Sequence, residues 1–178
     1  CLRLRNGLSL SCLPLKKKRL AFTLLATCLA SMPALAQNAS QIAGVKAGRS
    51  CPNCNLFQAD FDYEDISRRN LAGSRLRQSD LSLSTAEYTN FSRADLSIAN
   101  MYGIRATGAN FARANLSQAS MVGGYFSGAN FAGAVLTGAN LSGAEAAGAR
   151  GLTQRQLNGA CGDATTELPR GLHIAPCR

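Results

Sequence analysis

The residues of this sequence that could do chemistry are few, and its cysteines are the most prominent among them. Cys51 and Cys54 form a Cys-x-x-Cys pair, and Cys161 and Cys177 lie 16 residues apart near the C-terminal end. A Cys-x-x-Cys pair is typical of a redox-active dithiol, of a metal clamp or of a structural disulfide. A redox thiol needs a lowered pKa, such as the N-terminus of a helix provides. The choice among the three therefore depends on the elements that hold the cysteines.

Residues for acid–base or nucleophilic catalysis are not grouped in the sequence. His173 is the one histidine, and it lies between Leu172 and Ile174 in the C-terminal tail. We find no serine or cysteine nucleophile beside a base, no carboxylate pair set for a cleft, and no Gly-Lys-Ser/Thr segment of a phosphate-binding loop. We therefore expect no enzyme activity, no cofactor and no metal site.

The first 36 residues have the pattern of a secretory signal peptide. A basic cluster at 16–19 precedes an apolar run at 20–30, and the small-residue sequence Ala34-Leu35-Ala36 follows before Gln37. The 17 residues 20–36 are interrupted by a serine and a proline, so they are shorter than the ~20 apolar residues of a membrane span. Cys28 gives an alternative, because it resembles a lipid-attachment position, although a threonine precedes it where a smaller residue is expected.

Most of the positive charge belongs to this leader. The whole sequence carries a formal charge of +9, whereas residues 37–178 contain 13 Lys and Arg against 10 Asp and Glu. A charge of +3 is too small to indicate a nucleic-acid partner. Without the leader four cysteines remain, an even number that suits disulfides in an oxidising compartment. We expect a periplasmic or secreted protein.

A five-residue repeat runs without a gap from residue 54 to residue 148 and makes nineteen pentads. The central residue of 16 pentads is Leu, Phe, Met or Ile, beginning with Leu56. The residue two places before the centre is small in 16 pentads, and the residue directly before it is Asn or Asp in 12. Neither the 3.6-residue period of a helix nor the two-residue period of a strand explains this spacing. Each pentad is therefore one side of a coil.

The pattern resembles the pentapeptide-repeat family, whose motif is A-[D/N]-L-x-x. Matching segments are Ala94-Asp95-Leu96, Ala109-Asn110-Phe111 and Ala139-Asn140-Leu141. The resemblance implies an all-β fold, a right-handed quadrilateral parallel β-helix with four pentads per coil. It also implies that the centre and the small residue two places before it point inward, while the other three residues point outward.

Stacking physics leads to the same architecture. Parallel strands lie about 4.8 Å apart, so 95 residues at 20 per coil give about 4.75 coils and a rod of about 23 Å. Residues 20 apart then lie above one another, and like residues do recur at that spacing: Leu56, Leu76, Leu96, Leu116 and Leu136 in one column, Phe91, Phe111 and Phe131 in another, and Asn70, Asn90, Asn110 and Asn130 in a third.

The open ends of such a rod need caps. Thr153-x-x-Gln156 forms a capping box that predicts a short C-terminal helix over 154–161. The chain thus divides into a signal peptide (1–36), an N-terminal lead-in and cap (37–53), the β-helix (54–148), and a C-terminal helical cap and tail (149–178). A disulfide between Cys161 and Cys177 would stabilise that cap by about 3 kcal/mol.

The rod also decides among the roles of the cysteines. Cys54 takes the inward small-residue position of a pentad, which favours a structural disulfide with Cys51 over a redox pair. One zinc ion cannot join all four cysteines, because the ends of the rod are about 23 Å apart and a Zn–S bond is ~2.3 Å.

One side of the rod departs from the repeat and is the candidate interaction face. It contains the three alanine centres together with Glu64 and Ile104 at positions that prefer small residues, and its exposed residues include Arg68, Tyr88, Arg105 and Tyr125. Tyrosine and arginine are common at recognition sites. The alternative is that this side varies freely because small centres and large neighbours exchange volume.

We therefore expect a non-catalytic, exported structural or protein-interaction module. Its partner would be an unknown protein in the envelope or outside the cell, with no nucleic acid bound and no membrane span in the mature form. An inhibitor that acts by surface mimicry is the alternative, although the charge and the export disfavour the gyrase-binding DNA mimicry known in the family. A Cys-x-x-Cys redox protein is the third possibility.

Export makes the first testable prediction. The leader should be removed between Ala36 and Gln37, so N-terminal sequencing of the protein recovered from outside the cytoplasm should begin at Gln37. An intact leader, or a lipid attached to Cys28, would contradict this processing.

Overall fold

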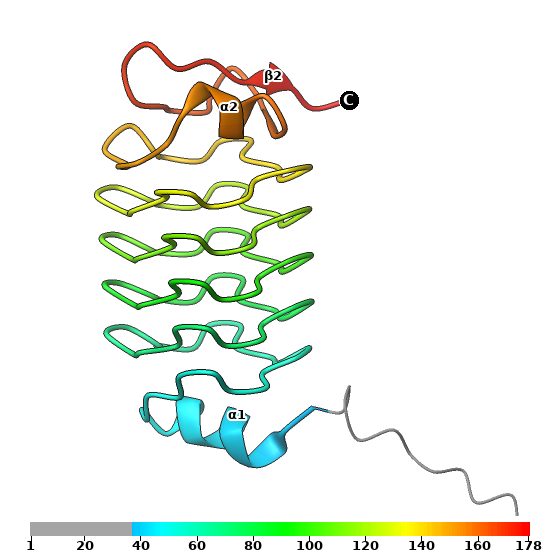
Figure 1. The fold of residues 1–178 in the computed structure, drawn as a ribbon, viewed down its shortest axis with the longest axis vertical. Coiled ribbons are helices and arrows are strands. Elements are labelled where there is room, and N and C mark those ends of the chain that lie inside the picture. Colours follow the sequence, from blue (N-terminus) through cyan, green and yellow to red (C-terminus); the bar gives the residue numbers. More distant parts are fainter. Residues whose placement is uncertain (1–36) are drawn as a thin grey trace, which may run out of the picture. The chain divides into compact units, whose positions relative to one another are not determined.

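A computed structural model of the chain describes residues 37–178. The expected signal peptide at 1–36, its cleavage site and the alternative lipid site at Cys28 lie outside these residues, apart from Gln37 itself. The described residues wind into a stack of four-sided coils with a helix at each end (Figure 1).

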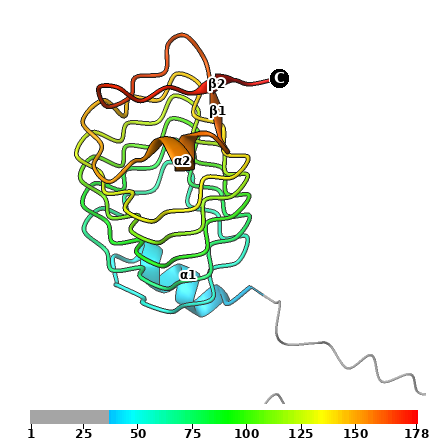
Figure 2. The same cartoon turned by 45° about the horizontal axis from the view of Figure 1, so that its top comes forward.

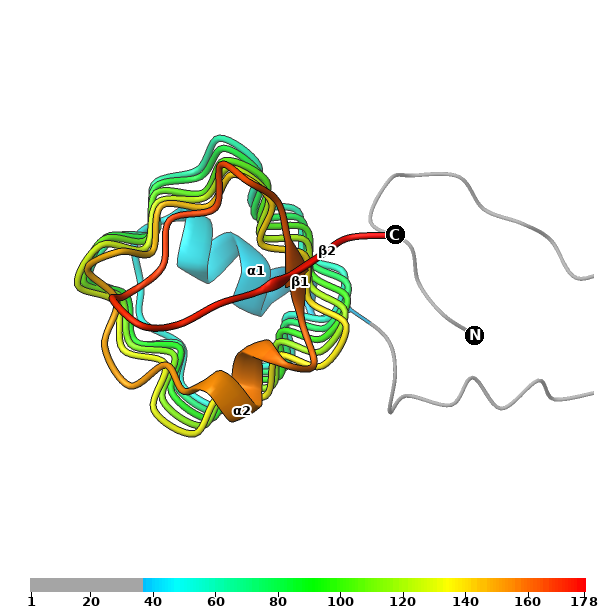
Figure 3. The same cartoon turned by 90° about the horizontal axis from the view of Figure 1, so that it is seen from above.

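Each side of a coil ends in a tight turn, which explains the pentad. The amide of Ala59 donates to the carbonyl of Leu56 at 3.0 Å, and the same bond recurs every five residues along the repeat. The residue that follows each turn pairs with the residue 20 positions later, beginning with Asn55 and Arg75. Seen from above, the coils superpose and four sides are distinguishable (Figure 3).

The four sides are named here by their columns of paired residues. The first side consists of Asn55, Arg75, Asp95, Asn115 and Val135; the second of Asp60, Asp80, Asn100, Ser120 and Asn140; the third of Asp65, Thr85, Arg105, Tyr125 and Glu145; the fourth of Asn70, Asn90, Asn110, Asn130 and Arg150. These pairs are single parallel bridges, so the coils contain no long strand. The two strands within residues 37–178 are β1 (Cys161–Gly162) and β2 (Ala175–Pro176), which pair in parallel.

The core is the interior of the stack, filled by pentad centres and the small residues two places before them. Phe111 lies between Phe91 and Phe131, with ring centroids 5.2 and 5.1 Å away and ring planes within 11° of parallel. The ring of Phe126 meets Phe111 edge-on at 6.1 Å. Both geometries are favourable for aromatic pairs. The coils are thus joined by stacked side chains as well as by backbone hydrogen bonds.

The preference for Asn and Asp before each centre has a hydrogen-bonding cause. The side-chain oxygen of Asn110 accepts from the backbone amide of Ala112 at 3.1 Å, which stabilises the turn. The Asn110 amide group donates to Asn90 one coil below at 3.3 Å, and Asn130 donates to Asn110 at 3.2 Å. The expected asparagine column is therefore a continuous ladder that bonds successive coils.

The N-terminal end is covered by helix α1 (Ala39–Lys46), an element that the sequence analysis did not identify. Asn38 caps this helix by accepting from the amide of Gln41 at 3.2 Å. Val45 is fully buried against the first coil, and the Gln41 side chain accepts from the amide of Asn55 at 2.8 Å. The helix thus buries apolar residues that the first coil would otherwise expose.

The C-terminal end carries helix α2 (Gln154–Leu157), which begins where the capping box predicts. The expected extent, 154–161, is wrong, because the chain rejoins the stack: the amide of Cys161 donates to the carbonyl of Ala139 at 2.9 Å. The tail then crosses the top of the stack and β2 pairs with β1 (Figure 2). Pro176 lacks an amide hydrogen, so it limits further strand addition at this edge.

The turns have a left-handed backbone at the second residue after each centre from Leu56 to Leu141. Eleven non-glycine residues of the described chain have positive φ, among them Tyr88 at 56° and Ile98 at 58°. Gly123, with φ of 62°, occupies the same turn position, and a Cβ built there meets no atom within 4 Å. A substitution of Gly123 therefore measures the free-energy cost of positive φ without a steric clash.

Removal of one stacked ring should strongly destabilise the rod. Phe111→Ala should lower the free energy of unfolding by about 3–5 kcal/mol, because the cavity cannot close between two fixed coils. Ser92→Ala, which changes an outward residue of the coil beneath, should lower it by less than about 0.5 kcal/mol. Chemical denaturation measures both values, and equal effects would show that the inward positions are wrongly assigned.

The cost of positive φ should be measurable at one glycine. Gly123→Ala should lower the free energy of unfolding by about 1–2 kcal/mol, since alanine disfavours the left-handed region. Gly123→Asn should cost clearly less, because asparagine tolerates that region. Thermal or urea denaturation of the two variants gives the comparison. If asparagine costs as much as alanine, backbone strain is not the cause.

Candidate interaction surface

All four tyrosines of the chain lie on one side of the stack and its two flanking corners. Tyr125 belongs to the third side, Tyr63 and Tyr102 lie at the corner before it, and Tyr88 lies at the corner after it. Between 44% and 75% of each of these residues is exposed. We call this surface, with Arg68 and Arg105, the tyrosine side.

Tyr88 is held at its corner by the coils below and above. The Arg68 guanidinium lies over the Tyr88 ring at 6.0 Å from its centroid, a distance suited to a cation–π contact. The ring also covers Gly108 in the next coil, where an added Cβ would come within 2.6 Å of it. Gly108 has no side chain and thus leaves the space that the Tyr88 ring fills. Contacts with Arg68 on one side and Gly108 on the other therefore hold the ring in one orientation.

Arg105 and Tyr125 lie one coil apart but have different neighbours. The Arg105 guanidinium contacts the Glu87 carboxylate at 3.5 Å. Arg105, Thr107 and Tyr125 line a hollow of about 240 Å³ on the third side. The hollow combines an aromatic ring, a hydroxyl group and a cation, which together can contact an apolar surface and donate hydrogen bonds.

The structure explains the two large residues, Glu64 and Ile104, that occupy small-residue positions of this side. The Glu64 carboxylate forms an ion pair with the Lys46 ammonium of α1 at 3.0 Å. Ile104 is fully buried, and a Cβ at Gly124 would lie 3.2 Å from it. Ile104 therefore fills the volume left by the alanine centres and by Gly124. Irregular inward residues do not themselves identify a binding face.

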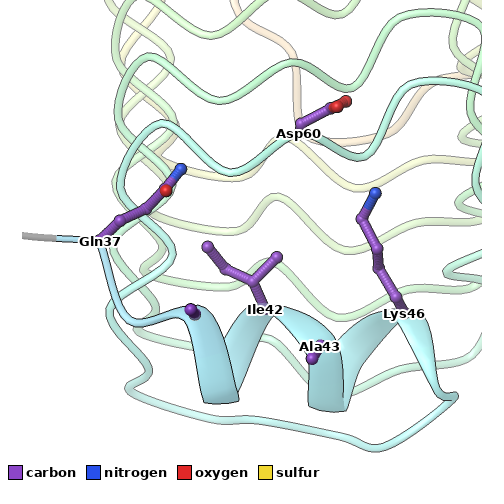
Figure 4. A pocket seen from close by; sticks show the side chains of 6 residues that line it. Gln37, Ile42, Ala43, Lys46 and Asp60 are labelled. Carbon is purple, nitrogen blue, oxygen red and sulfur yellow. The ribbon is translucent and has the colours of Figure 1, made fainter.

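A second hollow, of about 270 Å³, lies between α1 and the first coil. Figure 4 shows Gln37 and Lys46 on either side of Ile42, with Asp60 above them on the first coil. The pKa of Asp60 is lowered, chiefly because the Asp62 backbone amide donates to its carboxylate. The pKa of Asp62 is raised, chiefly by the hydrogen bond between its carboxyl group and Asp60.

The four cysteines of residues 37–178 form two disulfides, one near each end of the stack. Cys51 is bonded to Cys54, and Cys161 is bonded to Cys177. Cys54 points inward, and the Ser74 hydroxyl accepts from its amide at 3.2 Å while donating to the Cys51 carbonyl at 2.8 Å. This pair therefore joins the lead-in to the first coils, as expected of a structural staple.

His173 lies in the C-terminal tail, and the residue is exposed. Its backbone amide donates to the Gln154 side-chain oxygen at 3.0 Å, and its carbonyl accepts from the Gln154 side-chain amide at 2.9 Å. Within residues 37–178, no three His, Cys, Asp or Glu side chains are grouped to hold a metal ion. The helices of the same residues are too short and too polar to cross a membrane.

The sequence predicts Arg68, Tyr88, Arg105 and Tyr125 as an interaction face because their pentads belong to the side that departs from the repeat. Tyr63 and Tyr102 belong to pentads of the second side, so the same criterion does not include them. They lie beside the third side because they occupy the corner that the two sides share. That these residues form a binding face stays a prediction.

Comparison with known proteins agrees with the coil architecture. The family model described as "Pentapeptide repeats" matches eight copies, over residues 65–103 and 109–145. No curated protein sequence matches the chain. Pentapeptide repeats fold as right-handed quadrilateral β-helices.

Several solved structures are similar to this chain. HetL, a pentapeptide-repeat protein involved in heterocyst differentiation regulation in the cyanobacterium Nostoc sp. strain PCC 7120, is 32% identical, with a TM-score of 0.54. The match covers 56% of this chain and 48% of HetL, so it spans about half of that protein. Rfr23 from the cyanobacterium Cyanothece 51142 is 29% identical over 61% of this chain and 63% of its own, with a TM-score of 0.32. The pentad pattern, the coil geometry and the family match show that residues 65–103 and 109–145 of this chain consist of pentapeptide repeats.

Proposed function

We propose that this protein is an exported, non-catalytic interaction module that binds a protein partner through its tyrosine side. The observation that carries the proposal is the gathering of all four tyrosines, each exposed, on one side of a four-sided rod. Tyrosine and arginine are enriched at protein interfaces, and tyrosine buries a large area at a small entropic cost because it has only two χ angles. The pentapeptide repeats support the same class of function.

The tyrosine side is suited to recognition because its backbone is already ordered. Each coil of the third side is hydrogen-bonded to its neighbours, as between the Tyr125 amide and the Ile104 carbonyl at 2.8 Å. A partner would therefore have to order only side chains, which lowers the cost of binding. Arg105, held by Glu87, and the hollow beside Tyr125 would give such a partner a polar contact and a shallow recess.

Export belongs to the same proposal. The tripartite leader and the two disulfides near the ends of the stack support a periplasmic or secreted location. We take the rod to have about 4.75 coils, closed by α1 at one end and by the α2 tail at the other. A gyrase-type mimic of DNA is not favoured, since the paired residues of the second side are acidic only at Asp60 and Asp80.

Replacing two of the tyrosines tests the proposal. Tyr88→Ser with Tyr125→Ser should abolish photo-crosslinking to a protein of the envelope or extracellular fraction, because the two largest contacts near the hollow are lost. The melting temperature should change little, since both rings are exposed. Crosslinked products are identified by mass spectrometry, with the crosslinker at Thr107.

A matched double variant on another corner serves as the control. Gln78→Ser with Gln118→Ser alters two exposed residues of the corner between the first and second sides and should leave the crosslink intact. A crosslink that survives loss of both tyrosines, or one lost equally in both double variants, would contradict the tyrosine side.

A further inference from the structure

Five arginines lie on the first side of the rod, its flanking corners and the adjoining end of α2. Arg75 is in the column of the first side, Arg77 is at the next corner, and Arg93 and Arg113 lie above one another at the preceding corner. Arg155 of α2 lines a hollow together with Val135 of the first side and Thr137 of the corner after it. We call this surface the arginine side; the first side is opposite the third, which carries the tyrosines.

The arginine side holds the positive charge of the described chain. Its one acidic residue is Asp95, whose carboxylate accepts from the Ser97 hydroxyl at 2.6 Å and from the Asn115 amide group at 3.1 Å. Residues 37–178 contain 13 Lys and Arg and 10 Asp and Glu, so the remaining surface carries eight basic and nine acidic residues. The net positive charge therefore comes from this one side.

Three of these arginines are free to bind. The two ion pairs within residues 37–178 are Lys46–Glu64 and Arg105–Glu87, so Arg77, Arg93 and Arg113 make no ion pair there. All three are exposed. Their guanidinium groups keep their capacity to donate paired hydrogen bonds to an anion.

The fold does not require arginine at the corner that carries two of them. The column there reads Gly73, Arg93, Arg113 and Gly133, and all four residues have positive φ. Glycine adopts this backbone without strain, whereas arginine does not. Two like charges on adjacent coils, about 4.8 Å apart in backbone spacing, also repel each other. Positive φ costs every non-glycine residue at these turns, so the feature particular to the two arginines is their mutual repulsion, which a bound anion would relieve.

The distribution of the arginines indicates the shape of the anionic partner that this side can bind. Its cations are spread across the first side and both of its corners rather than gathered around one groove. The aliphatic stem of Arg113 packs along the corner, because its Cγ lies 3.5 Å from the Cβ position of Gly133. Exposed Ile98 and Val135 lie among the arginines. A flat, cationic surface with interspersed apolar residues complements a planar anionic partner.

We propose that the arginine side docks on an anionic membrane surface, with its guanidinium groups bound to the phosphates of lipid headgroups. Basic residues near such a surface are each attracted to the negative potential of the leaflet. This role is additional to the proposed protein binding, and it leaves the opposite tyrosine side free for a partner.

Vesicle binding tests the proposal directly. The mature protein, expressed from the full sequence and recovered after removal of residues 1–36, should bind vesicles of 30% phosphatidylglycerol in phosphatidylcholine. Its binding to pure phosphatidylcholine vesicles should be weak and should not depend on salt. Raising the NaCl concentration from 50 to 300 mM should release it, because salt screens exposed charges. Combined Arg77→Gln, Arg93→Gln and Arg113→Gln should lower the partition coefficient by about 100-fold.

A charge-matched variant distinguishes this surface from net charge alone. Arg49→Gln with Arg170→Gln and Arg178→Gln removes the same charge from other exposed positions and should lower the partition coefficient by less than about threefold. Equal losses in the two triple variants would overturn the proposal. The proposal would also be overturned if the protein were retained on a dextran sulfate column but did not bind anionic vesicles. That result would indicate a soluble polyanion as the partner of the arginine side. Neither result would affect crosslinking through the tyrosine side.

Discussion

The structure depends on one constraint: a residue pairs with the residue 20 positions later. The Leu56 amide donates to the carbonyl of Arg75, and the Arg75 amide donates back to Cys54, both at 2.9 Å. Each residue of a side is thereby tied to the coil above and to the coil below. The separation changes to 21 and 22 only where α2 and the tail close the stack, at Asn140–Cys161 and Glu145–Glu167. The strict period of five over residues 54–148 is therefore a consequence of this hydrogen bonding.

The turns determine where large outward residues can be placed. A corner side chain leans toward the next coil: Leu83 approaches Gly103, Tyr88 approaches Gly108 and Gln118 approaches Gly138. In each case glycine lacks the Cβ that would collide with the leaning side chain or crowd it. The later coils have glycine at most corners, so large corner residues gather nearer the N-terminus. The position of Tyr88 thus depends on its own coil and on the absence of a side chain one coil later.

The sequence predicted the coils better than it predicted their ends. The stacking of Phe91, Phe111 and Phe131 follows from their spacing of 20, because the register leaves the rings no other place. Helix α1 escaped prediction because it is only eight residues long and has a weak apolar face, although Asn38 followed by Gln41 is a capping signal. Glu64 was read as part of an irregular side, since its contact with Lys46 depends on that unpredicted helix. Tertiary contacts between unlike elements leave no periodic trace in a sequence.

A rigid stack allows opposite sides to act independently. Substitutions at the first and third sides share no contact, because the closely packed core of Leu and Phe columns lies between them, and their energetic effects should add. An opening of the coil at one side would break the register at the others, so neither surface can transmit binding by a local rearrangement. Any coupling between the arginine side and the tyrosine side must then be geometric: a rod held to a planar surface by one side presents the opposite side outward. Orientation, rather than a change of shape, is the means by which such a fold can link two partners.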